Sequence, residues 1–112
     1  MKIAVATEKG GLEDRVSDVF ARASTFTIVE IERGEIRDVR ILKNPATQSF
    51  SGAAVQAVRL LKENQVEVAV AEEFGPTAVE LLELEGIEIV RKRGIVKEVI
   101  EKIAGGEEDV SG

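Results

Sequence analysis

Hydrophobic and polar positions alternate along the chain in a way that predicts strands followed by amphipathic helices. The first apolar run, residues 3–6, is short and continuous, as is typical of a strand buried on both faces. Residues 26–33 and 34–42 predict two further strands, joined as a hairpin by a tight turn at Arg33-Gly34. Charged residues interrupt the second of these strands, which indicates an exposed edge of a sheet.

Helical spacing begins after a polar loop at residues 44–51. Residues 52–64 predict a helix with Ser51 as its N-cap. The apolar stripe of this helix comprises Ala54, Ala57, Val58 and Leu61. Pro76 at a first helical position and Gly86 beyond the last one predict a second helix, over about residues 76–85.

Two more strands and a third helix complete the pattern. Residues 66–71 and 87–90 predict buried strands, and residues 95–104 predict a helix. That helix buries Val96, Val99, Ile100 and Ile103. Residues 1–104 are therefore expected to form a single domain, and residues 105–112 a flexible acidic tail.

This order predicts an α/β fold with helices on both faces of a mixed five-stranded sheet. The hairpin is antiparallel, whereas each later strand–helix–strand crossover makes parallel neighbours. A strand order of 3-2-1-4-5 with strand 2 antiparallel satisfies both constraints. It also creates a topological switch point beside strand 1, where open α/β sheets usually bind ligands.

A candidate binding site follows from the loops that meet at this edge of the sheet. The first two helices begin there, with unpaired N–H groups and small residues that let a ligand approach the backbone. A nearby arginine in the long loop at residues 8–22 supplies a positive charge. The predicted anion-binding residues are Arg22, Ser51, Gly52, Ala53, Gly75 and Thr77. The alternative is that these residues serve only as caps and turns, with the arginine paired to Asp14 or Asp18.

Composition excludes several chemistries. The 112 residues include no His and no Cys, so side chains can offer a metal only oxygen ligands and the thioether of Met1. Acidic residues outnumber basic ones by 21 to 15, which argues against nucleic-acid binding. We find no signal peptide or membrane span and expect a cytoplasmic protein. The abundance of Glu, Lys, Arg, Val and Ile resembles that of thermophilic proteins.

Several segments together resemble the dinitrogenase iron–molybdenum cofactor biosynthesis family over most of the chain. They read KIAVATE, SDVFARASTFTIVEIERGEI, NPATQ, SGAAVQAVRLL, VEVAVAEEFGPTAVELLELEGIEIV and GIVKEVIEKI. The resemblance implies a three-layer α/β/α domain with a ribonuclease H-like motif. It also implies that the protein binds or carries the iron–molybdenum cofactor or a precursor.

The chain departs from the family pattern at its ligand positions. The resemblance implies histidines where this sequence has Val19 and Ser51, and glycines where it has Glu72 and Glu73. Soft imidazole ligands are thus absent, and the added carboxylates disfavour an anionic cluster. Any iron–molybdenum or iron–sulfur cluster is expected to bind without His or Cys ligands.

Three functions are therefore considered. The first is a non-enzymatic accessory protein for metallocluster assembly, with assembly proteins as partners. The second is a family member that has lost the cluster and acts through protein contacts, as a monomer or a weak homodimer through residues 37–42. The third, by analogy with ribonuclease H, is a Mg²⁺-dependent hydrolase that uses Glu8 and Glu72. Strand 1 supplies no Asp for such a centre.

Overall fold

The computed structural model describes residues 1–48 and 52–106 and contains the predicted five-stranded sheet. Strand β1 (Lys2–Thr7) lies at its centre, parallel to β4 (Val68–Ala71) and antiparallel to β2 (Thr25–Glu32). The outer strands are β3 (Glu35–Lys43), antiparallel to β2, and β5 (Glu88–Arg91), parallel to β4. The order β3-β2-β1-β4-β5 confirms the prediction.

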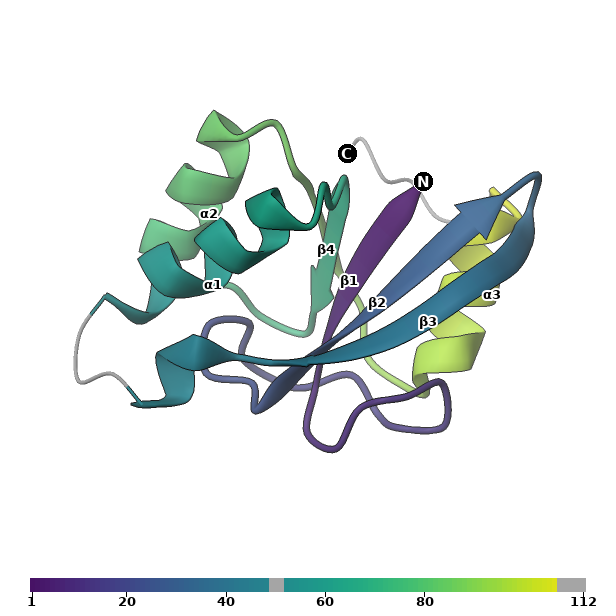
Figure 1. Ribbon diagram of the computed structural model, residues 1–112, viewed down its shortest axis with the longest axis horizontal. Coiled ribbons are helices and arrows are strands. Elements are labelled where there is room, and N and C mark those ends of the chain that lie inside the picture. The colour runs from purple at the N-terminus through teal and green to yellow at the C-terminus, as the bar shows by residue number, and fades with distance from the viewer. Residues whose placement is uncertain (49–51, 107–112) are drawn as a thin grey trace.

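Helices cover both faces of the sheet, which confirms the three-layer α/β/α architecture (Figure 1). Helices α1 (Ala53–Glu63) and α2 (Pro76–Leu84) lie on one face, and α3 (Val96–Ala104) lies on the other. Successive residues of a strand point to opposite faces, so β1 contributes to two cores. Ala4 and Ala6 pack with α1 and α2, whereas Ile3 and Val5 pack with α3.

The hairpin between β2 and β3 turns at Arg33 and Gly34. Both residues have positive φ angles, 55° and 79°, which match the backbone twist of a tight hairpin turn. Strand β3 forms the edge of the sheet, as its charged residues predict. The register between the two strands shifts by one residue at Glu30 and Ile31, and this bulge leaves Arg37 without a partner in β2.

The helix boundaries agree with the sequence except at α1. That helix begins at Ala53, and its N-cap is Gly52 with a φ of 74°. The N-cap was predicted at Ser51, which lies outside the described residues. Ala53 is buried together with Ala57, Val58 and Leu61, whereas Ala54, which was predicted in the stripe, is only partly buried.

Two segments differ in detail from the predictions. The loop after β3 contains a 3₁₀ helix, Pro45–Gln48, which Asn44 supports by accepting the Ala46 N–H at its side-chain oxygen. The strand predicted from residue 66 begins only at Val68, because the Val66 N–H still donates to the Leu61 carbonyl at the end of α1. No helix in the described part of the chain is long and apolar enough to cross a membrane.

Candidate functional site

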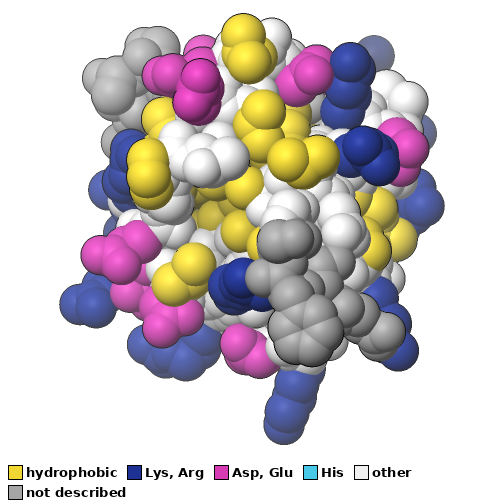
Figure 2. Space-filling model, turned by 90° about the vertical axis from the view of Figure 1, so that its left-hand side faces the viewer, with side chains coloured by type: hydrophobic (Ala, Val, Ile, Leu, Met, Phe, Trp, Pro, Cys, Tyr) yellow, Lys and Arg dark blue, Asp and Glu magenta, His cyan; other side chains and the backbone are white. Residues whose placement is uncertain are grey.

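A cavity of about 340 Å³ opens at the edge of the sheet where β1 and β4 end. Its lining combines three separate segments, the loop before β2 and the starts of α1 and α2. The lining residues are Val19, Ala21, Arg22, Gly52, Ala53, Ala54, Val55, Gly75, Pro76, Thr77 and Ala78. Figure 2 shows this end of the molecule, where hydrophobic side chains surround a hollow and charged side chains lie around them. We call it the crevice.

The crevice contains Arg22, Gly52, Ala53, Gly75 and Thr77, so the structure brings these predicted site residues together. Ser51 lies outside the described residues. The predicted site missed the apolar residues of the lining, above all Val19 and Val55, whose exposed fractions are 37% and 43%. Val55 points away from the buried stripe of α1, so the helical period alone marks it as exposed but gives it no ligand role.

Two helix N-termini open into the crevice without a side-chain cap. Gly52 and Gly75 are the N-caps of α1 and α2, and neither has a side chain that could accept a first-turn N–H. Pro76 follows directly and lacks an N–H, so Thr77 is the first donor of α2. Two helix dipoles therefore present partial positive charge to the same space, which favours an anion.

Helix α3 shows the opposite arrangement. Its first N–H groups, from Val96 and Lys97, donate to the carbonyl oxygens of Asp14 and Leu12 at 2.8 and 2.9 Å. The loop that follows β1 thus caps this helix with its own backbone. The contrast leaves α1 and α2 as the helices whose N-termini line a cavity at this edge.

Asp14 in turn shapes that loop. Its Oδ2 atom accepts the N–H groups of Glu8, Lys9 and Gly10 at 3.0, 2.9 and 2.9 Å, and Oδ1 accepts that of Arg15 at 2.8 Å. Burial raises the pKa of Asp14, but these backbone donors outweigh it and hold the pKa below its ordinary value. The Asp14 carboxylate is therefore occupied by the loop backbone.

Backbone hydrogen bonds attach the segment that carries Arg22 to the sheet. The Ser17 N–H donates to the Ala6 carbonyl at 2.7 Å, and the Ser17 carbonyl accepts the Glu72 N–H at 3.0 Å. Farther along, the Phe20 N–H donates to the Glu73 carbonyl at 3.0 Å. The segment thus runs beside the ends of β1 and β4, which fixes Val19 and Arg22 next to the start of α2.

The acidic residues near this edge contact other polar side chains. The Oε1 atom of Glu72 lies 3.4 Å from Nη2 of Arg93, and the Glu8 carboxylate accepts a hydrogen bond from the Ser24 hydroxyl at 2.9 Å. Neither Glu72 nor Glu73 lines the crevice. Within residues 1–48 and 52–106, no three acidic side chains come close enough together to hold a metal ion.

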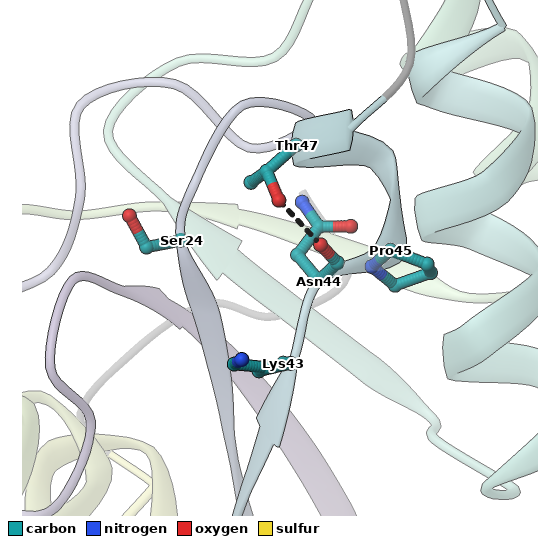
Figure 3. A pocket seen from close by; sticks show the side chains of 5 residues that line it. All are labelled: Ser24, Lys43, Asn44, Pro45 and Thr47. Atoms are coloured by element: carbon teal, nitrogen blue, oxygen red, sulfur yellow. Dashed lines mark hydrogen bonds between the residues drawn. The ribbon is translucent and has the colours of Figure 1, made fainter.

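A second cavity, of about 520 Å³, lies between the start of β2 and the 3₁₀ helix (Figure 3). Its polar groups already serve the fold. The Asn44 amide donates to the carbonyls of Ala21 and Ala23, and the Thr47 hydroxyl donates to the Asn44 carbonyl. The Ser24 hydroxyl is bonded to Glu8, which leaves Lys43 as the charged group of this pocket. We assign no ligand to it.

Comparison with known proteins gives the family. The model of the family described as dinitrogenase iron-molybdenum cofactor matches residues 1–106. An uncharacterized protein of Methanocaldococcus jannaschii is 31% identical over 91 residues, which cover 81% of this chain and 74% of the relative.

Solved structures share the fold. The apo form of the orange protein from Desulfovibrio gigas superimposes with a TM-score of 0.89 at 24% identity, covering 99% of this chain and 92% of the other. A candidate NifB protein from Thermotoga superimposes with a TM-score of 0.79 at 28% identity, covering 99% of this chain and 94% of the other. From its sequence and its fold, this chain belongs to the dinitrogenase iron-molybdenum cofactor family.

Proposed function

We propose that this protein is a non-enzymatic accessory protein of the cytoplasm that holds a small anionic metallocluster, or a precursor of one, in the crevice. The observation that carries the proposal is the convergence of Arg22 and two uncapped helix N-termini on one cavity. At about 340 Å³ the cavity is within the size range of small-molecule sites, roughly 300–1,000 Å³. Family membership supports the choice of ligand class.

The proposed binding is electrostatic. The sequence contains no His and no Cys, so the soft side-chain ligands that clusters usually take are absent. Met1 cannot substitute, because β1 begins beside it and reaches the crevice edge only at its far end. The first-turn N–H groups of α1 and α2 and the guanidinium of Arg22 are therefore the proposed donors to the ligand.

The apolar rim supports the same proposal. Val19 and Val55 place exposed aliphatic surface at the mouth of the crevice, beside the charged donors. Low-dielectric walls strengthen electrostatic attraction between a buried anion and fixed dipoles. An apolar lining with a few convergent polar donors is the usual composition of a small-molecule site.

Anaerobic gel filtration with isolated iron–molybdenum cofactor tests the proposal. Iron and molybdenum are expected to co-elute with the protein, and Arg22→Gln is expected to weaken binding by about tenfold, the equivalent of about 1.4 kcal/mol. Arg37→Gln is the matched control, because it removes the same charge from β3 and should bind normally. Circular dichroism checks that both variants fold.

Two outcomes would contradict the proposal. The first is elution of the folded wild-type protein without metal, which would favour the alternative of a family member that acts through protein contacts alone. The second is equal loss of binding in both variants, because this would assign the effect to net charge rather than to the crevice. Metallocluster-assembly proteins are the partners we propose for a protein that carries such a ligand.

A further inference from the structure

We infer that the free edge of β3 pairs with the β3 edge of a second copy of this chain, antiparallel and centred on Val39. This inference does not depend on the crevice, because β3 contributes no residue to it. The pairing would join two five-stranded sheets into one continuous sheet across a two-fold axis.

The edge itself offers the backbone for such pairing. Strand β3 spans nine residues and pairs with β2 on one side only. An unpaired strand of this length presents a row of free N–H and C=O groups, which is a template for another strand. Ile41, with 50% of its surface exposed, adds an apolar side chain beside this row.

The charge pattern of β3 selects one register. In an antiparallel pair, side chains that lie directly opposite each other point to the same face of the sheet. When the two strands are related by a two-fold axis perpendicular to the sheet, one residue must therefore lie opposite its own copy, with the axis midway between them. Centring on Asp38 or on Arg40 would place two like charges opposite each other. Centring on Val39 instead places Asp38 opposite the partner's Arg40, and does so twice by symmetry.

The single chain leaves these two charges unsatisfied. The cross-strand neighbour of Asp38 is Glu30, a like charge, and that of Arg40 is Ile28, an apolar residue. Within the described ranges neither Asp38 nor Arg40 forms an ion pair. Directly opposed side chains on paired strands lie roughly 4.5–5.5 Å apart at Cβ, so the partner's Arg40 would reach Asp38 and offset its repulsion from Glu30.

Apolar contacts reinforce the same register on the other face. Val39 pairs with Val29 and Ile41 with Thr27, so both point to the face that α3 covers. Val39 would meet the partner's Val39 directly, and Ile41 would lie diagonally across from it. The bulge at Arg37 ends regular pairing beyond Asp38, so the interface is short and the dimer forms only at high protein concentration.

Sedimentation velocity over a concentration series tests the inference. The measured mass of the wild-type protein is expected to rise from the 12.1 kDa of one chain toward twice that value as the protein concentration increases. Asp38→Arg and Arg40→Asp should each weaken association by about tenfold or more, because each places like charges opposite one another twice. The double variant Asp38→Arg with Arg40→Asp should restore it, since the reversed pair is again complementary.

Arg59→Asp serves as the control for Arg40→Asp, because Arg59 is an exposed residue of α1 and its reversal lowers the net charge by the same amount. It should associate like the wild type. A constant monomer mass at all concentrations would overturn the inference, and so would a double variant that stays as weak as the single ones.

Discussion

The ring of Phe74 stacks on the ring of Phe20, with centroids 5.0 Å apart and planes inclined by 25°. Phe20 also contacts Phe26 of β2 at 5.1 Å, and Arg91 lies 5.6 Å above the Phe74 ring. This stack joins the segment that carries Arg22 to the segment that leads into α2. The two sides of the crevice are thus held by aromatic packing as well as by backbone hydrogen bonds.

Replacing Phe74 by leucine should destabilise the protein by about 1 kcal/mol, because it removes an aromatic pair and a cation–π contact while keeping apolar volume. Replacing the fully buried Phe20 by alanine should cost more, about 3–5 kcal/mol, because it also leaves a cavity. Urea unfolding gives both values. A larger loss for Phe74→Leu than for Phe20→Ala would contradict this description of the stack.

Asp14→Asn should reduce the stability of the loop after β1. Near neutral pH the loss is expected to be about 1–3 kcal/mol, because an amide cannot accept at both positions that the carboxylate oxygens occupy. The folded-state pKa of Asp14 is lowered, so its contribution is present above the unfolded-state pKa, about 3.9, and is lost as the pH falls through the folded-state pKa.

Urea titrations of the two proteins across this acidic range provide the measurement. Their stabilities should differ at neutral pH and converge in acid, when wild-type Asp14 is protonated. Asp18→Asn is the control, since Asp18 is an exposed carboxylate of the neighbouring segment. A difference between Asp14→Asn and the wild type that persists unchanged at low pH would exclude the charge as its cause.

Val19→His should strengthen cluster binding, because it places an imidazole at the rim of the crevice, at the position where the family resemblance implies one. We expect affinity for isolated iron–molybdenum cofactor to rise by about tenfold or more. The gain should disappear below a pH of about 6.5, since a protonated imidazole cannot ligate a metal. Ile41→His, at an exposed apolar position elsewhere, should give no gain.

Gly10→Ala should be more destabilising than Gly34→Ala. Both glycines have positive φ angles, 93° and 79°, so a side chain is strained at either position. A Cβ at Gly10 would also overlap the side chain of Ile41, whereas one at Gly34 would meet nothing within 4 Å. The extra destabilisation by Gly10→Ala should become smaller when Ile41 is also replaced by alanine. A double-mutant cycle, followed by thermal unfolding, measures this difference.

The sequence predicts most of the fold because its signals are local. The Arg33-Gly34 turn, Pro76 at the start of α2 and the buried stripe of α3 each follow from a few neighbouring residues. Crossover and hairpin rules then leave few ways to order the strands. The start of α1 is less well defined, since small residues on both sides of Gly52 fit a helix boundary equally well.

The site is only partly predictable. Topology brings Arg22, Gly52 and Gly75 to one edge, and the structure places them on one cavity. The loop backbone that caps α3 depends on Asp14 contacts over several residues, which no spacing rule reveals. The direction of the Glu72 side chain, toward Arg93, likewise depends on tertiary packing.

Amide-resolved NMR of the ¹⁵N-labelled protein with isolated iron–molybdenum cofactor tests the central claim most directly. If the crevice holds the ligand, the amide signals of Ala54 and Thr77, in the first turns of α1 and α2, should shift or broaden, while those of β3 stay unchanged. Bound cofactor that leaves Ala54 and Thr77 unaffected and perturbs another surface would contradict the claim.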